Sequence, residues 1–107
     1  MPDDNDFLFE ALTPLGFQVH VTRTYWEIIT TIKHPVMVGR EAFVQEVLTN
    51  PDEIRLSKKD SSVYLFYKAE NNKRWVCAVA KHLNENGFLI TTYLTDAIKE
   101  GEKIWPK

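Results

Sequence analysis

The segment WVCAVAKH, residues 75–82, is apolar along almost its whole length. An apolar run this short, bounded by polar turns, is typical of a buried β-strand. Similar segments occur at residues 54–56, 63–68 and 88–93, and short polar stretches separate them. Tight turns join antiparallel strands, because parallel strands need long crossover connections. The four segments therefore predict an antiparallel meander with residues 75–82 near its centre.

The region before these strands has helical periodicity. Four residues fall on one helical face, at spacings i, i+3, i+4 and i+7: Tyr25, Ile28, Ile29 and Ile32. Thr24 and Glu27 have the spacing of a capping box at the start of this helix. Pro35 disfavours helical geometry at His34, so the helix is expected to end there. A second helix is expected at about residues 40–48, stopped by Asn50-Pro51.

These patterns together predict an α+β domain. Residues 17–21 alternate as a strand does, so we expect an N-terminal strand and two helices packed on one face of a four-stranded antiparallel meander sheet. Residues 1–16 are interpreted as an acidic lead-in segment, and residues 17–107 as one domain. Residues 96–100 are expected to form one helical turn that ends at Gly101.

Composition limits the class of protein. Cys77 is the sole cysteine, which excludes an internal disulfide and favours a reducing, cytoplasmic compartment. No secretory signal is recognised at the start, and no apolar run is long enough to span a membrane. The formal net charge is −2. Four of the 15 acidic residues precede residue 17, so the remainder holds 13 basic and 11 acidic residues, a balance that permits a local basic face.

Motifs for a metal or a cofactor are absent from the sequence. The three histidines have no short ligand spacing, and there is no HExxH, CxxC, GxGxxG, phosphate loop or nucleophile elbow. We therefore expect no cofactor and no metal site. Acid–base chemistry on phosphate remains compatible with the residue types present, because RNA supplies its own 2′-hydroxyl as nucleophile.

His34 is the first candidate for such chemistry. The helix macrodipole favours a cationic histidine at a helix C-terminus, which suits a general acid or a phosphate contact, and Lys33 adds a second cation beside it. The alternative is structural: a His-Pro helix stop whose imidazole caps the last carbonyl groups.

Further candidates lie on the predicted strands. Arg55 and Ser57 share the polar face of one strand, Lys81 ends the apolar strand, and Thr91 and Tyr93 share a face of the last strand. In the expected register these groups gather on the sheet face that the helices leave bare. The alternative is that they only solvate an exposed face.

Several segments together resemble the phage-type branch of the barnase–EndoU–colicin–RelE nuclease superfamily. They are Lys33-His34-Pro35, the run from Asn50-Pro51 to Ser57, Val63–Tyr67, Val76–Lys81 and Gly87–Tyr93. The resemblance covers roughly residues 17–105 and implies helices followed by a four-stranded antiparallel sheet. It also implies metal-independent RNA cleavage, often by a toxin or conflict-system effector. By position, the resemblance assigns the catalytic roles to His34, Arg55, Lys81, Thr91 and Tyr93.

Three hypotheses follow. The first is a ribonuclease that cleaves by 2′-hydroxyl transphosphorylation, in which Lys33, Ser57 and Tyr67 are expected to contact substrate; an antitoxin or immunity protein would be its partner. The second is an inactive module of the same fold that binds RNA or protein, which the acidic net charge favours. The third is a homodimer with exposed aromatics, such as Tyr64 or Trp105, at the interface.

Overall fold

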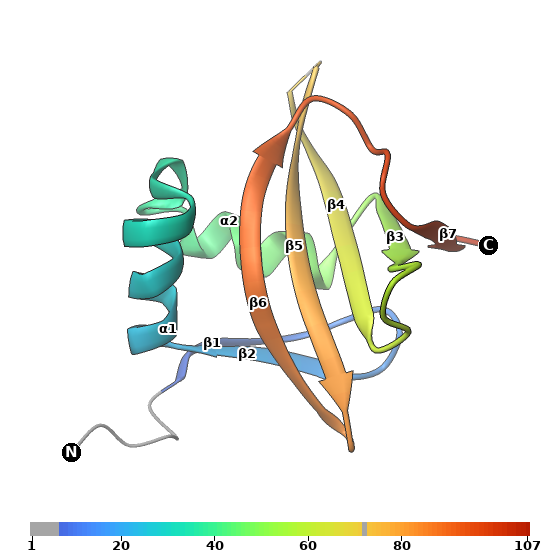
Figure 1. Cartoon of the computed structure of the whole chain (residues 1–107), viewed down its shortest axis with the longest axis horizontal. Coiled ribbons are helices and arrows are strands. Elements are labelled where there is room, and N and C mark those ends of the chain that lie inside the picture. Colours follow the sequence, from blue (N-terminus) through green and yellow to red (C-terminus); the bar gives the residue numbers. More distant parts are fainter. Residues whose placement is uncertain (1–6, 72) are drawn as a thin grey trace.

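The computed structural model describes residues 7–71 and 73–107. One mixed sheet runs through it, in the order β1-β2-β6-β5-β4-β3-β7 (Figure 1). Its seven strands are β1 (Phe7–Leu12), β2 (Gln18–Thr22), β3 (Glu53–Leu56), β4 (Val63–Asn71), β5 (Arg74–Leu83), β6 (Asn86–Thr95) and β7 (Glu102–Trp105). Strand β5 has β4 and β6 as its neighbours, so the apolar segment 75–82 lies inside the sheet.

The prediction of a four-stranded antiparallel meander is wrong. Strands β3, β4, β5 and β6 pair antiparallel in succession, but the sheet continues at both ends. Strand β2 joins β6 in parallel, and β1 pairs with β2. On the other side β7 pairs with β3. The chain is therefore α+β with a seven-stranded mixed sheet.

Residue burial explains why β1 forms, and the path of residues 96–100 explains how β7 reaches the sheet. Phe9 and Ala11 of β1 are buried while Glu10 and Leu12 between and after them are exposed, the alternation of a strand with one covered face. The interpretation of residues 7–12 as part of a loose lead-in is therefore wrong for these residues. Residues 96–100 form no helical turn; they are an irregular connection that lets β7 reach β3.

Two α-helices and two shorter helical turns lie in the described part of the chain between β2 and β3. They are α1 (Arg23–Ile28), the π-helical turn η1 (Ile29–Lys33), the 3₁₀ turn η2 (Pro35–Met37) and α2 (Glu41–Thr49). Thr22, not Thr24, caps α1, and its hydroxyl accepts a hydrogen bond from the amide of Tyr25. The predicted end at His34-Pro35 is confirmed: η1 stops at Lys33, and the His34 amide donates to the Ile29 carbonyl.

The main core lies between the helices and one face of the sheet. In Figure 1 the curved strands β4, β5 and β6 cross the centre, α2 passes behind them and α1 stands beside β6. Val44, Val47 and Leu48 of α2 are fully buried in one cluster with Phe66 and Val76 of the sheet. Because α2 packs on this face, the opposite face of β4, β5 and β6 is not covered by it.

A glycine lets β2 approach β6. The parallel pairing is short, Val19 with Gly87 and His20 with Phe88. A Cβ atom at residue 87 would collide with the carbonyl oxygen of Gln18, so only glycine permits this contact.

No helix in the described residues is long and apolar enough to cross a membrane. The exposed aromatics predicted as a dimer interface are not free: Tyr64 and Trp105 are half-buried against the main core. Tyr64 also contacts Phe17, with ring centroids 5.2 Å apart.

Candidate functional site

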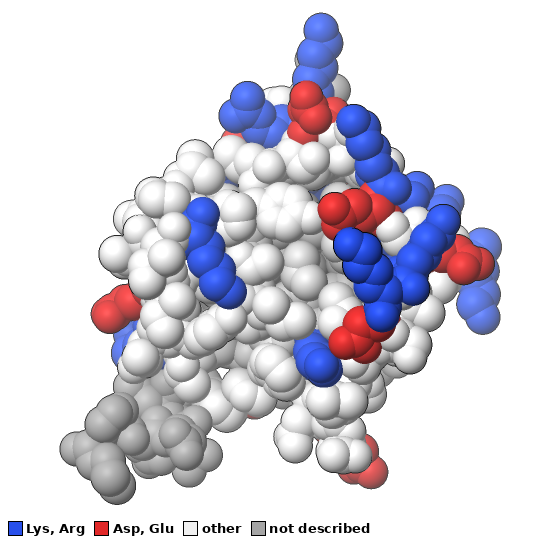
Figure 2. Space-filling model, viewed as in Figure 1, with Lys and Arg blue, Asp and Glu red and all other residues white. Residues whose placement is uncertain are grey.

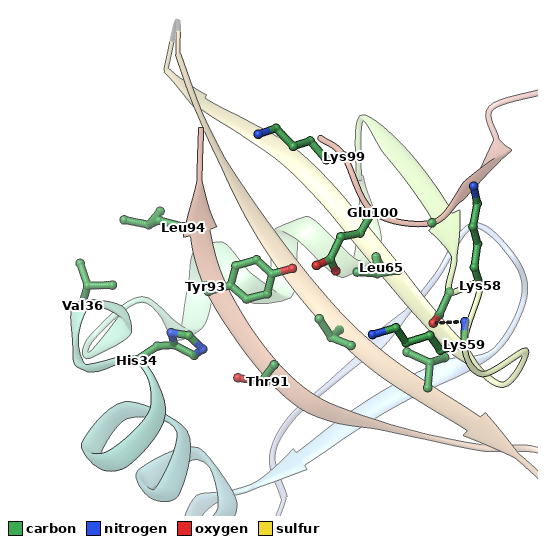
Figure 3. A pocket seen from close by; sticks show the side chains of 14 residues that line it. His34, Val36, Lys58, Lys59, Leu65, Thr91, Tyr93, Leu94, Lys99 and Glu100 are labelled. Atoms are coloured by element: carbon green, nitrogen blue, oxygen red, sulfur yellow. Dashed lines mark hydrogen bonds between the residues drawn. The ribbon is translucent and has the colours of Figure 1, made fainter. Parts of the chain in front are cut away.

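The sheet face opposite α2 is hollowed. The cavity has a volume of about 830 Å³. Its floor is apolar, formed by Val63 and Leu65 of β4 and Val79 of β5. Its walls come from four segments: the His34–Val36 turn, strand β6, residues 57–59, and residues 99–101 (Figure 3). We call this cavity the hollow.

His34 stands at one wall of the hollow. The backbone leaves helical geometry there, with φ −143° and ψ 77°, as expected for a residue before proline. This turn carries the imidazole toward β6, where its ring centroid lies 5.5 Å from that of Tyr93. No described residue forms a hydrogen bond with the His34 side chain, so among these residues the ring does not cap the helix. The structural alternative for His34 therefore loses its support.

Thr91 and Tyr93 belong to β6 and lie beside the turn that carries His34. Both residues line the hollow (Figure 3). The Thr91 hydroxyl oxygen is shielded from solvent and has no hydrogen-bond partner among the described residues. A buried hydroxyl without a partner is uncommon in proteins, but a group that solvent does not reach is not open to a ligand in this arrangement.

The Tyr93 hydroxyl belongs to a small buried cluster. Tyr67, Cys77 and Tyr93 stand side by side on β4, β5 and β6, because the register pairs Tyr67 with Cys77 and Cys77 with Tyr93. Burial raises the pKa of all three groups, to about 12 for the Cys77 thiol. All three are therefore protonated near neutral pH. Tyr67 is only 1% exposed and does not line the hollow, contrary to the prediction that it contacts substrate.

The charged groups of the hollow are ones that the sequence interpretation missed. Lys58 and Lys59 line it from the turn after β3, and Lys99 and Glu100 line it from the segment between β6 and β7. In Figure 3 Lys59 and Glu100 point into the hollow, whereas the Lys58 and Lys99 side chains extend away from it. In Figure 3 the Glu100 carboxylate and the Tyr93 hydroxyl point toward one another, and Glu100 lies across the hollow from His34. The proximity of Glu100 also contributes to the raised pKa of Tyr93.

On the same face, charge is uneven. Lys and Arg side chains, mixed with some acids, gather toward the β3 and β7 side, while the centre over β5 and β6 is nearly free of charge (Figure 2). The hollow thus has an apolar floor and a predominantly basic rim on one side. Ser57 also lines this side of the hollow, and its hydroxyl accepts a hydrogen bond from the Lys59 amide.

Three of the predicted cations do not line the hollow. Lys81 is paired with Asp60 at 3.4 Å. Hydrogen bonds from Ser62, and then the nearby Lys81, lower the pKa of Asp60. Arg55 is paired with Glu53 at 2.6 Å.

The third cation, Lys33, binds the helical layer to the sheet. The β5–β6 pairing is irregular between Val79 and Ala80, which leaves Ile90 without a partner residue on β5. The Ile90 carbonyl accepts hydrogen bonds from the Tyr25 hydroxyl at 2.8 Å and from Lys33 Nζ at 3.4 Å. Lys33 is therefore engaged in a structural contact beside the hollow.

Among the described residues, no three histidine, cysteine or acidic side chains are grouped closely enough to hold a metal ion. No family model, curated protein or solved structure matches this chain. The hollow and its side chains are accordingly the basis for a functional proposal.

Proposed function

We propose that the protein is a ribonuclease that cleaves RNA in the hollow by transphosphorylation, without a metal ion. The observation that carries the proposal is the placement of an imidazole, His34, and a carboxylate, Glu100, on opposite walls of one open cavity. Cleavage of a phosphodiester by its own 2′-hydroxyl requires a base at the attacking oxygen and an acid at the leaving oxygen. The two groups supply these roles from the two sides of a bound phosphate.

In this mechanism Glu100 removes the proton from the 2′-hydroxyl as that oxygen attacks phosphorus. His34 gives a proton to the 5′-oxygen as its bond to phosphorus breaks, which leaves a 2′,3′-cyclic phosphate. Tyr93 donates a hydrogen bond to a non-bridging oxygen, where negative charge increases. Thr91 lines the same wall, but its shielded hydroxyl makes no contact with the phosphate. Lys59, on the opposite rim, adds a positive charge near the same phosphate.

The apolar floor suits the rest of the substrate. The floor of the hollow is apolar, and RNA recognised in single-stranded form presents unstacked bases that can pack against such a floor. The cations on the rim attract the backbone. Arg55 and Lys81, which the resemblance assigned to the phosphate, do not contact it in this mechanism because each is paired with a carboxylate outside the hollow.

The test is RNA cleavage by purified protein in EDTA, followed by detection of cyclic phosphate ends. We expect cleavage by the wild type and a loss of about 100-fold or more in His34→Ala and Glu100→Gln. His82→Gln is the matched control, because the His82 ring stacks on Phe17 at 4.0 Å outside the hollow. Full activity in both site variants would contradict the assigned roles, and no cleavage by the wild type would contradict the function.

A second candidate is a binding module that holds RNA without cleaving it. The observation that favours it is the pairing of Arg55 and Lys81 with carboxylates, which leaves fewer free cations to stabilise a transition state. The same preparation distinguishes the two functions, since a binding module gives saturable RNA binding and intact RNA.

A further inference from the structure

The segment that carries Glu100 crosses the sheet. It leaves the end of β6, passes the ends of β5 and β4, and joins β7 at the far edge beside β3 (Figure 1). Residues 96–101, which we call the crossing segment, contain no helix or strand. A backbone without such regular hydrogen bonds needs other anchors if it is to hold a side chain in one place.

One anchor is Gly101, at the end of the crossing segment. Its φ of +81° lies in the left-handed region that favours glycine. A Cβ atom there would lie 2.7 Å from the carbonyl oxygen of Leu56 and 3.1 Å from Cβ of Arg55. The crossing segment therefore rests directly on the backbone of β3, in a position that only glycine allows.

A second anchor is Arg55. The start of the segment is held as well, by the Thr95 hydroxyl at Ala97 and by the packing of Ile98 against the buried cluster of Leu65, Tyr67 and Cys77. The Arg55 guanidinium donates from Nε to Glu53 at 2.6 Å and from a terminal nitrogen to the Gly101 carbonyl at 3.2 Å. The Arg55 and Glu53 side chains are only 22% and 18% exposed. The planar fork of arginine can make both bonds at once, whereas an ammonium group is a single point of charge.

We propose that Arg55 is a positioning residue that holds the crossing segment, and with it Glu100, against the hollow opposite His34. This inference rests on the proposed function for the role of Glu100. It replaces the sequence-derived expectation that Arg55 neutralises the phosphate. Arg55 acts on the reaction through Gly101 and Glu100, and it does not touch the substrate.

The surroundings of Glu100 define what the positioning achieves. The titratable and charged groups that face Glu100 come from every neighbouring element: Tyr67 on β4, Cys77 on β5, Tyr93 on β6, Lys59 on the rim and His34 across the hollow. Lys58 and Lys99 also line the hollow, but their side chains extend away from Glu100 (Figure 3). A shift of the crossing segment changes the distance from Glu100 to all the groups that face it. The expected result is a slower chemical step with little change in substrate binding.

The test substitutes Arg55→Lys, which keeps the positive charge and removes the fork. We expect kcat to fall about tenfold with KM nearly unchanged, and no further fall when Arg55→Lys is added to Glu100→Gln. Gly101→Ala displaces the same segment from the backbone side and is expected to give the same pattern. Arg74→Lys, on an exposed residue of β5, is the matched control and should leave kcat and KM unchanged.

A second measurement does not depend on cleavage. Backbone amide resonances of residues 99–101 are expected to shift, and their hydrogen exchange to accelerate, in Arg55→Lys and Gly101→Ala but not in Arg74→Lys. Unchanged resonances overturn the positioning role whether or not the protein cleaves RNA. The positioning role is also overturned if Arg55→Lys raises KM and if the losses of kcat in Arg55→Lys and Glu100→Gln multiply in the double variant. That result would indicate that Arg55 contacts the phosphate directly. Absence of cleavage by the wild type contradicts only the proposed function.

Discussion

At the scale of single residues, burial decides what Tyr93 can do. Its hydroxyl lies beside Cys77, and burial raises its pKa above the ordinary value of 10.0. The phenol therefore keeps its proton at neutral and mildly alkaline pH, so it can donate a hydrogen bond but cannot serve as a base. A catalytic base must come from another group, and Glu100 is the carboxylate that lines the hollow.

We expect Tyr93→Phe to lower kcat for RNA cleavage by about 100-fold, the typical loss when one donor to a developing negative charge is removed. Because Tyr93 does not titrate in this range, the wild-type rate should show no inflection from it below about pH 10. The rate–pH profile of the variant should keep the shape of the wild type. Tyr64→Phe, on the core face of β4, is the control. A lost alkaline limb in Tyr93→Phe would contradict the donor role.

Some residues of the hollow can be predicted from local sequence patterns, and others cannot. His34 was predicted because a proline fixes the helix end next to it, and Thr91 and Tyr93 because strand alternation places them on one face. Glu100 was missed because it lies in an irregular segment whose path depends on Gly101 meeting β3. The pairing of Arg55 was readable in principle, since Glu53 lies two residues away on the same strand face.

At the scale of elements, one carbonyl group joins the helical layer to the sheet. The Ile90 carbonyl lies at the irregular step of the β5–β6 pairing and accepts from Tyr25 on α1 and Lys33 on η1. The bond from Tyr25, at 2.8 Å, is the shorter of the two. This contact holds the helical turn that carries His34 against β6.

We expect Tyr25→Phe to lower the free energy of unfolding by about 1 kcal/mol, because a half-buried carbonyl loses its better partner. Urea denaturation measures this loss as a lower midpoint with an unchanged m value. Tyr64→Phe is again the matched variant, since no described residue forms a hydrogen bond with the Tyr64 hydroxyl. Equal losses in the two variants would show that the Ile90 contact contributes nothing specific.

Elements were predictable where the signal is local. Polar turns and alternating residues located β3 to β6, and α2 begins and ends within one residue of its expected bounds. The edge strand β7 was not found, because it has four residues and pairs with β3, which is distant in sequence. The edge strand β1 was missed although it pairs with the next strand, β2, because its residues were interpreted as part of the acidic lead-in. The parallel β2–β6 contact is also between segments distant in sequence. The one residue that hints at it is Gly87, because a close approach of two strands requires glycine there.

At the scale of the whole molecule, the two faces of the sheet differ in what covers them. One face is covered by α2 and the other helical turns and carries the main core. The other face has an open hollow whose lysines stand along one side (Figure 2). The acidic net charge of −2 is therefore a poor guide to binding, because the local charge at the hollow has the opposite sign.

This local charge predicts salt-dependent binding of single-stranded nucleic acid. Three lysines line the hollow, Lys58, Lys59 and Lys99. If each contacts one phosphate, the slope of log binding constant against log salt concentration should be about −2 for a single strand, since each contact contributes about −0.7. Fluorescence anisotropy with a labelled 2′-O-methyl oligonucleotide measures the slope without cleavage. Lys59→Gln should reduce its size by about 0.7. Lys73→Gln, at an exposed residue just before β5, should leave the slope unchanged. A slope that neither variant alters would place the bound strand elsewhere on the molecule.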